Sequence, residues 1–243
     1  MWFGLGRKDI ERQWLFERCK EFDANPNGHI DLWARDHYKS SIITYAGTIR
    51  EILASHGDDP VNPREQCIGI FSHTRPIAKA FLRQIKQEFE GNELLKSLFP
   101  DILWENPAKQ APKWSEDDGI TVKRKSNPKE QTLEAWGLVD GQPTSKHFTG
   151  MVFDDVVTRE SVTTPEMIAK TTDALKLSFN LGSQGTEWRR MIGTRYHFND
   201  TYKPMIESGT FKPRIHTATH NGEPDGEPVL LSRETLSLKR RDF

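Results

Sequence analysis

The chain alternates short apolar runs with longer segments of helical periodicity, and this alternation constrains the fold more than any other feature. Four runs have the length of strands: HIDLWA (29–34), QCIGIF (66–71), FTGMVFDDVV (148–157) and EWRRMIGT (187–194). Helical patterns follow the first three runs, from Lys39 to near Gly57, over 72–90 and over 164–182. Strands that alternate with helices indicate a mainly parallel sheet with helices on both faces, so we predict an α/β fold.

The remaining segments fit around this core. An amphipathic pattern over 9–22 predicts a helix before the first strand, and the turn sequence NPNG closes it. Prolines make 99–115 a loop, and two alternating segments around Asn127-Pro128 predict a hairpin. The pattern weakens after Tyr202, and the stretch from His216 to Pro228 is predicted to be loop or linker.

Composition limits the classes of function. A formal net charge of −1 gives no global basic field, so any contact with DNA requires a local patch. Cys19 and Cys67 lie far apart and form no zinc or disulfide motif, which favours a reducing compartment. No stretch approaches the ~18 apolar residues of a membrane span, and the N-terminus lacks the apolar core of a signal peptide. We therefore expect a folded cytosolic protein without a membrane segment.

The loop after the first strand, ARDHYKSS (34–41), has the ingredients of a phosphate loop except its glycines. In such a loop a lysine neutralises phosphate and the next hydroxyl coordinates magnesium, which Lys39 and Ser40 supply. Glycines permit positive φ, and Asp36 and His37 are residue types that tolerate it. The motif alone is equally compatible with a solvent-facing loop that has no function.

Two aspartates end the third apolar run. Asp154 and Asp155 fit an arrangement in which the first carboxylate belongs to the magnesium shell and the second orients or deprotonates the attacking water. The alternative is an ordinary aspartate turn or helix cap after a buried strand. Parallel sheets bind ligands outside the carboxyl ends of their strands. Four polar clusters follow the four runs there, at 35–40, 72–75, 154–155 and 193–195, and together they favour a nucleotide site.

These motifs, in this order, resemble the ATPase domain of the large terminase subunit of tailed bacteriophages, the motor that packages DNA into a procapsid. The resemblance covers nearly the whole chain and is carried by ARDHYKSS, IGIFSHTRPIAKAFLRQIK, VFDD and IGTRYHFNDTY. It implies a P-loop NTPase domain of the RecA/ASCE-like class over 1–215. Residues 216–243 would be a linker or lid region that leads toward a nuclease domain absent from this chain, so we expect a fragment or truncated protein without nuclease activity.

The resemblance also implies the roles of individual residues. Lys39 and Ser40 would bind phosphate and magnesium, and Arg35 would reach the γ-phosphate. Asp154 would belong to the magnesium shell, and Gly193-Thr194 would couple hydrolysis to movement. The expected catalytic residues are Asp155, Arg35 and Thr194, and the metal ligands are Ser40 and Asp154. The expected contacts with ATP are Arg35, Asp36, His37, Tyr38, Lys39, Ser40, Ser41 and Gln13.

The sequence departs from the family pattern at three places. Many members have glutamate at the position of Asp155, so Glu160 is the alternative base. The arginine that a neighbouring subunit supplies has no counterpart, and Lys146 is the nearest cation, without the forked geometry of arginine. The adenine contacts are equally open, since Gln13 and Trp14 precede the loop suitably while a tryptophan at helical spacing is commonly core.

The function implied is ATP hydrolysis, with ATP and Mg²⁺, that drives double-stranded DNA into a procapsid in the host cytoplasm. The implied partners are the portal protein, the small terminase subunit and further copies of the chain in a ring. The alternatives are a helicase-like ATPase and a nucleotide-binding, DNA-associated assembly module without significant turnover. For DNA the sequence offers two basic clusters, Lys123 to Lys125 and Lys239 to Arg241, although such clusters are commonly solvated.

Overall fold

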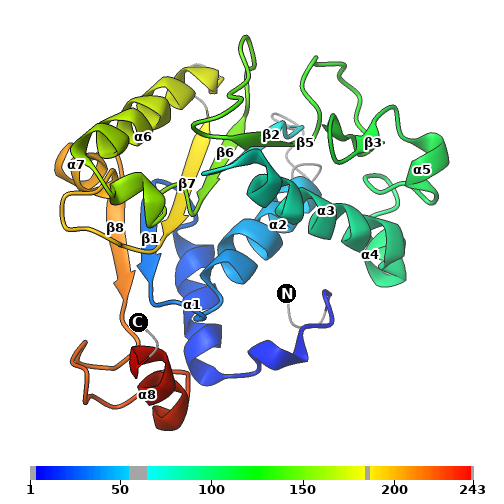
Figure 1. The fold of residues 1–243 in the computed structure, drawn as a ribbon. Coiled ribbons are helices and arrows are strands. Elements are labelled where there is room, and N and C mark those ends of the chain that lie inside the picture. Colours follow the sequence, from blue (N-terminus) through cyan, green and yellow to red (C-terminus); the bar gives the residue numbers. More distant parts are fainter. Residues whose placement is uncertain (1–3, 55–64, 184–186, 242–243) are drawn as a thin grey trace.

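One mainly parallel sheet organises the chain (Figure 1). The computed structural model describes residues 4–54, 65–183 and 187–241. Within these residues eight strands form the order β3-β4-β5-β2-β6-β7-β1-β8. Their bounds, in that order, are Trp114–Ser115, Gly119–Ile120, Leu133–Gly137, Ile68–Ser72, Gly150–Asp154, Trp188–Gly193, His29–Trp33 and Lys212–His216. All pairings from β5 to β8 are parallel, whereas β3 and β4 are antiparallel additions at one edge.

Helices cover both faces of this sheet, as predicted. The α-helices are α1 (Gln13–Ala24), α2 (Gly47–Ala54), α3 (Arg75–Gly91), α4 (Glu93–Leu98), α5 (Pro107–Gln110), α6 (Pro165–Ser178), α7 (Tyr202–Glu207) and α8 (Arg233–Arg241). Short 3₁₀ turns occur at Lys8–Ile10, Glu160–Val162 and Phe179–Leu181, and a π-helical segment, η2, spans Ser41–Ala46. A larger core cluster packs α1 to α3 on one face, and a smaller cluster packs α6 and α7 on the other. The prediction of an α/β fold with helices on both faces is confirmed.

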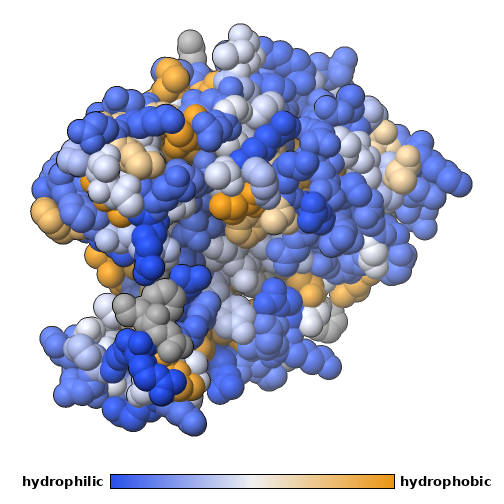
Figure 2. Space-filling model, in the orientation of Figure 1, coloured by the Kyte–Doolittle hydropathy of each residue, from blue (hydrophilic) through white to orange (hydrophobic). Residues whose placement is uncertain are grey.

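The surface is mainly polar. The face of the molecule in Figure 2 is predominantly hydrophilic, with apolar residues only in scattered areas. Among the residues that the structure describes, no helix combines the length and the apolar character needed to cross a bilayer.

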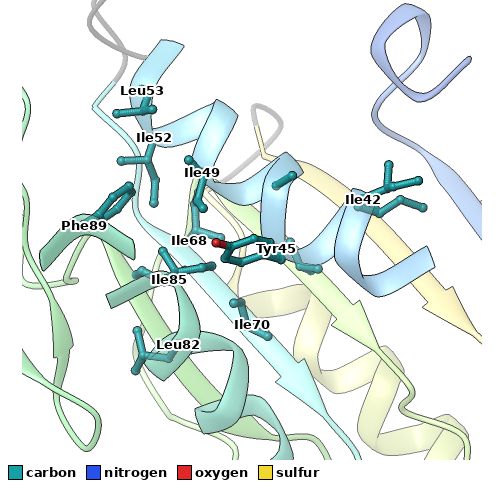
Figure 3. Packing of buried hydrophobic residues seen from close by; sticks show 14 of the residues in the cluster. Ile42, Tyr45, Ile49, Ile52, Leu53, Ile68, Ile70, Leu82, Ile85 and Phe89 are labelled. Carbon is teal, nitrogen blue, oxygen red and sulfur yellow. The ribbon is translucent and has the colours of Figure 1, made fainter. Parts of the chain in front are cut away.

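The pleat of the strands explains how one sheet contributes side chains to the core clusters on both of its faces. Ile68 and Ile70 of β2 point toward η2, α2 and α3, and Figure 3 shows them against Ile85. Phe71, the next residue along the strand, belongs to the opposite cluster. Side chains of a strand alternate between its two faces, so a strand with apolar residues in both registers is buried on both sides, as parallel strands usually are. All five residues of β2 are buried.

The strand order brings the functional loops together. β7 lies between β1 and β6, with Gly193 opposite Leu32 and Ile192 opposite Asp154. The loop after β1, the carboxyl end of β6 and the carboxyl end of β7 therefore meet at one edge of the sheet, although they are far apart in sequence. Three of the four predicted polar clusters therefore converge, whereas the fourth, at 72–75, follows β2, which lies on the other side of β6.

Several elements differ from the sequence prediction. The predicted hairpin is reduced to one antiparallel pair, Ile120 opposite Leu133, and the region predicted as loop contains β3 and the short helix α5, which begins at Pro107. Proline is tolerated there because the N–H groups of the first helical turn have no acceptor within the helix, so the missing N–H of proline costs no hydrogen bond. The predicted end of the helix near Gly57 lies outside the described residues.

The largest omission is the C-terminal part, where α7, β8 and α8 were not predicted. β8 is an edge strand in which four of the five residues are exposed or partly exposed and one is a proline, Pro213, so it lacks the apolar alternation of a strand. α8 has a single buried residue, Leu236, and therefore no apolar stripe.

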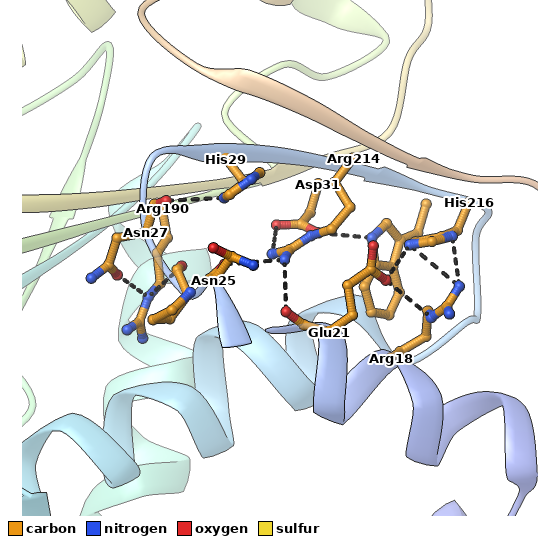
Figure 4. A network of polar contacts seen from close by, with 11 residues as sticks. Arg18, Glu21, Asn25, Asn27, His29, Asp31, Arg190, Arg214 and His216 are labelled. Carbon is orange, nitrogen blue, oxygen red and sulfur yellow. Dashed lines mark hydrogen bonds and ion pairs between the residues drawn. The ribbon is translucent and has the colours of Figure 1, made fainter. Parts of the chain in front are cut away.

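A buried polar network joins α1, β1 and β8 (Figure 4). The guanidinium of Arg214 donates two hydrogen bonds to the carboxylate of Asp31, at 2.6 and 2.8 Å. It also donates to the carbonyl of Asn25 at 3.2 Å, and the indole of Trp33 donates to Asp31 at 2.9 Å. Asp31 and Arg214 are 1% and 6% exposed. A pair this buried is sensitive to removal of one partner, because the other charge is then left without compensation.

We expect Asp31→Ala to lower the free energy of unfolding by about 3–5 kcal/mol, because it leaves the guanidinium of Arg214 buried and unpaired. For a chain of this size the midpoint of thermal unfolding should fall by on the order of 10 °C. The double variant Asp31→Leu, Arg214→Met, which removes both charges, should lose much less. Calorimetry on the three proteins checks this, and a single variant as stable as the wild type would contradict the role of the pair.

Candidate functional site

The loop between β1 and η2 obtains its curvature from two residues with positive φ. Asp36 and Tyr38 both have φ of 62°. The prediction that Asp36 takes the place of a glycine is therefore confirmed, and the prediction for His37 is wrong. The imidazole of His37 is buried instead, with Nδ1 2.7 Å from the carbonyl of Arg35 and its ring edge-on to Trp14. Burial also lowers the pKa of His37, which keeps the ring neutral.

This loop lines a cavity of about 340 Å³ at the carboxyl ends of β1, β6 and β7. The lining residues are Arg35, Asp36, His37, Tyr38, Lys39, Ser40, Ser41, Asp155, Thr194 and Tyr196. Nine of these ten were candidates from the sequence, and Tyr196 is the addition. A larger apolar cavity of about 550 Å³ lies between α1, α2 and α4, but it contains none of the candidate residues. We regard the smaller cavity as the functional site because the loop and both strand ends converge on it.

Lys39 links the loop to the end of β7. Its Nζ donates a hydrogen bond of 3.0 Å to the hydroxyl of Thr194, and the side chain is 7% exposed. An ammonium held in this way by a single neutral partner can donate further hydrogen bonds to an anion in the cavity. Lys39 and Thr194, separated by 155 positions, thus form one contact at the site.

Ser40 links the loop to the end of β6. Its hydroxyl donates to Oδ1 of Asp154 at 3.0 Å, and the hydroxyl of Thr44, one helical turn later, donates to Oδ2. Thr44 is fully buried within η2 and was not a candidate from the sequence. Its only sequence signal is the spacing of four residues from Ser40, which places both hydroxyls on one face of a helix. The carboxylate of Asp154 is therefore oriented by two hydroxyl donors.

Asp154 is 1% exposed, and its environment opposes ionisation. Burial, with a smaller contribution from the neighbouring Asp155, raises the pKa of Asp154 to about 7, and the hydrogen bonds from Thr44 and Ser40 act in the opposite direction. A divalent cation stabilises the ionised form of such a carboxylate. The hydroxyl and carboxylate oxygens here are the ligand types that Mg²⁺ prefers, and Mg²⁺ is usually held by one or two carboxylates together with substrate phosphate. Ser40 and Asp154 therefore fit a magnesium ion bound jointly with a nucleotide.

Asp155 occupies a different environment from its neighbour. It has φ of 46°, and its backbone N–H donates to the carbonyl of Ile192 at 2.9 Å, so the turn after β6 is tied to β7. The side chain lines the cavity, and its Oδ1 is buried without a hydrogen-bond partner among the described residues. A buried carboxylate oxygen without a partner is unusual and is typical of a functional group that awaits a ligand or water. Glu160, the alternative base, is exposed and does not line the cavity.

Gly193, which precedes Thr194, is required by packing. A Cβ at this position would lie 2.0 Å from the phenolic oxygen of Tyr202. The same oxygen accepts a hydrogen bond of 3.4 Å from the N–H of Val157, two residues after Asp155. The end of β7, the turn after β6 and the start of α7 are therefore in contact around one buried tyrosine.

Other candidates lie away from the cavity. Gln13, at the start of α1, donates to Glu17 at 3.0 Å and does not line the cavity. Lys146 is held by the buried Glu134 at 2.9 Å. In the first basic cluster, Lys123 donates to the carbonyl of Pro100 and Arg124 to those of Glu130 and Pro128. Two of its three cations are thus engaged within the chain.

The second basic cluster is in an unexpected place. Lys239, on α8, donates a hydrogen bond to the carboxylate of Asp36 in the loop. No sequence pattern indicates this contact, because 203 positions separate the two residues and α8 was not predicted.

We expect Thr44→Val to lower the free energy of unfolding by about 1–3 kcal/mol at pH 8, where Asp154 is mainly ionised and one of its buried oxygens loses its donor. Thr44→Ser keeps the hydroxyl and should remain close to the wild type. Urea unfolding of the three proteins tests this, and a valine variant as stable as the serine variant would show that the hydrogen bond contributes nothing.

Comparisons with known proteins agree with the fold. No sequence-family profile and no curated protein sequence matches the chain. Among solved structures, the large terminase of a thermophilic bacteriophage is similar with a TM-score of 0.51 and 12% identity. The match covers 95% of this chain and 50% of that one, so the chain spans half the length of this terminase. A mutant of the large terminase ATPase domain of Thermus phage P74-26 aligns with a TM-score of 0.49 and 14% identity, over 93% of this chain and 87% of that domain.

The structural likeness confirms, at the level of the fold, the resemblance that the motifs indicate. The chain therefore has a mainly parallel α/β fold, and this fold is similar to that of half of a bacteriophage large terminase.

Proposed function

We propose that the chain binds and hydrolyses ATP in the cavity formed by residues 35–41, Asp155, Thr194 and Tyr196. The observation that carries this proposal is the pair of contacts from the loop, Lys39 to Thr194 and Ser40 to Asp154. They hold an ammonium suited to phosphate and a hydroxyl suited to a metal at the cavity lining, with the carboxylate of Asp154 hydrogen-bonded to that hydroxyl, and phosphoryl transfer requires groups of these kinds.

In this proposal Lys39 and Arg35 bind the phosphates, and Ser40 and Asp154 hold Mg²⁺. The metal, when bound, supplies charge neutralisation between the phosphates. Arg35 lies at the start of the loop, where its guanidinium would contact the γ-phosphate and stabilise the charge that develops there. Loop residues 36–38 and Ser41 complete the enclosure, and Gln13 is assigned no contact because it does not line the cavity.

Asp155 acts as the base or orienting group in this proposal. Its buried oxygen without a partner supports the assignment, because a water molecule in the cavity would satisfy it and be positioned for attack. Thr194 exchanges its contact with Lys39 when phosphate enters, so it senses the state of the site from the end of β7. The site thus combines residues for binding phosphate, residues for binding the metal, a base and a residue that senses the bound phosphate.

The likeness to a large terminase supports a proposal for the wider role. We propose that hydrolysis drives movement of double-stranded DNA into a procapsid, in the host cytoplasm, by a ring of copies of this chain that acts with a portal protein and a small terminase subunit. Residues 216–243 would form the linker or lid beside the ATPase domain of residues 1–215. Lys146, held by Glu134, is a poor candidate for a cation supplied in trans, so a neighbouring subunit would use another residue.

The experiment that tests the function measures ATP turnover with and without Mg²⁺, and with and without double-stranded DNA, beside equilibrium binding of ATP. Turnover that requires Mg²⁺ and rises with DNA, without strand separation, supports the motor ATPase. Strand separation would favour a helicase-like ATPase. Tight binding without turnover, even with partner subunits present, would favour a nucleotide-binding assembly module. Absence of binding would overturn the proposal.

A further inference from the structure

The C-terminal helix places a cation against the phosphate loop. Lys239 forms an ion pair with Asp36, and the two side chains are 38% and 48% exposed. An exposed ion pair contributes little to stability by itself. The position of the helix has other support, since Leu236 is buried at 7% exposure and Leu230, just before the helix, packs against the larger core cluster. Apolar packing therefore fixes the position of α8, and the ion pair between Lys239 and Asp36 is a consequence of that position.

The path of the chain explains how α8 reaches the loop. β8 runs parallel to β1 with His216 opposite Trp33, and the N–H of Ala34 donates to the carbonyl of His216 at 2.9 Å. The chain thus leaves β8 beside the first residue of the loop. A turn closed by a bridge between Thr219 and Pro228 then directs it into α8, which lies beyond the carboxyl ends of β1 and β8 in Figure 1.

The ion pair between Lys239 and Asp36 changes the balance of charge around the cavity. The lining contains two cations, Arg35 and Lys39, and two carboxylates, Asp36 and Asp155. Such a lining is balanced, which is a poor environment for a polyanion, and Asp36 lies in the loop that would contact the phosphates. The hydrogen bond from Lys239 lowers the pKa of Asp36, so the carboxylate is held ionised and paired. With Lys239 included, the positive charges exceed the negative ones.

We infer that Lys239 is a positioning residue of the phosphate site: it neutralises Asp36 from α8 and so makes the affinity for nucleoside triphosphate depend on the seating of that helix. The inference rests on the proposed function and deepens it, since it adds a third cation, which comes from the C-terminal segment. Displacement of α8 would expose Asp36 to the phosphates and weaken their binding.

The test is equilibrium binding of Mg²⁺-ATP to the full chain by titration calorimetry. Lys239→Ala should weaken binding about three- to fivefold, the upper part of the scale of an exposed charge interaction, and Lys239→Arg should restore it. In an Asp36→Asn background, where no carboxylate needs neutralisation, Lys239→Ala should change the affinity less than about twofold by the same reasoning. Arg240→Ala is the matched control, because Arg240 is exposed in the same helical turn and forms no hydrogen bond or ion pair with the described residues.

The outcomes separate this inference from the proposed function. Wild-type affinity in Lys239→Ala would overturn the inference, and so would an equal loss in the presence and absence of the Asp36 carboxylate, since Lys239 would then act on the ligand or the fold directly. Both results leave the proposed function intact as long as Lys39→Ala strongly weakens binding. Failure of the wild type to bind Mg²⁺-ATP would instead overturn the proposed function.

Discussion

Replacing Lys39 by alanine is expected to weaken ATP binding by about 30-fold or more. Lys39 is nearly buried, and its ammonium faces the cavity with Thr194 as its partner. Truncation of a buried, hydrogen-bonded charge at a binding site costs about 2–5 kcal/mol, which corresponds to this loss of affinity. The lining would also retain only one of its two cations against the two carboxylates. Titration calorimetry with Mg²⁺-ATP measures the effect directly.

A matched control shows whether such a loss is specific. Lys96 is also nearly buried, at 9% exposure, but it pairs with Glu93 on α4 and does not line the cavity. Lys96→Ala should bind ATP as the wild type does, even where its stability is lower. Equal affinities of wild type and Lys39→Ala would refute the phosphate-loop interpretation, and the likeness to terminases would then concern the fold alone.

Replacing Asp155 by asparagine is expected to abolish most turnover while ATP binding persists. Asparagine has nearly the same shape and tolerates the positive φ of this position, so the turn after β6 should remain intact. It cannot accept a proton from water, and loss of a general base lowers the rate about 10²- to 10⁴-fold. Removal of a negative charge from the lining should leave the affinity for ATP equal or higher. Single-turnover hydrolysis and equilibrium binding on the same protein separate the two effects.

Glu160→Gln is the companion variant, because Glu160 is the other acid that the sequence offers as a base. It is exposed and lies outside the cavity lining, so we expect unchanged turnover. If Glu160→Gln lost turnover and Asp155→Asn kept it, the roles of the two acids would be reversed.

The sequence predicted those strands, helices and loops that can be recognised from the pattern of neighbouring residues. Strands buried on both faces, such as β2, appear as short apolar runs, and parallel sheets bring their carboxyl ends to one edge. From these two facts the convergence of Lys39, Ser40, Asp154 and Thr194 follows without coordinates. The first helix, the parallel class of the sheet and most of the cavity lining could be predicted from the sequence for the same reason.

Contacts that depend on packing between residues far apart in the sequence could not be predicted. The choice of Tyr38 instead of His37 for positive φ depends on the buried site that receives the imidazole, beside Trp14. The role of Thr44 depends on the orientation of η2 against β6. The ion pair between Asp36 and Lys239 depends on β8, an edge strand that lacks an apolar pattern. In each case the deciding partner lies in another element.

The central place of β7 limits how a chemical event at the site can do mechanical work. β7 is hydrogen-bonded along both edges, to β1 and to β6, so it cannot slide without breaking two ladders at once. Under the proposed function, a change at Thr194 would be transmitted along the segment between β7 and Tyr202. The phenolic oxygen of Tyr202 lies close to Gly193, so the two ends of that segment are in contact. The sheet would then stay rigid while the residues between Thr194 and Tyr202 move against it.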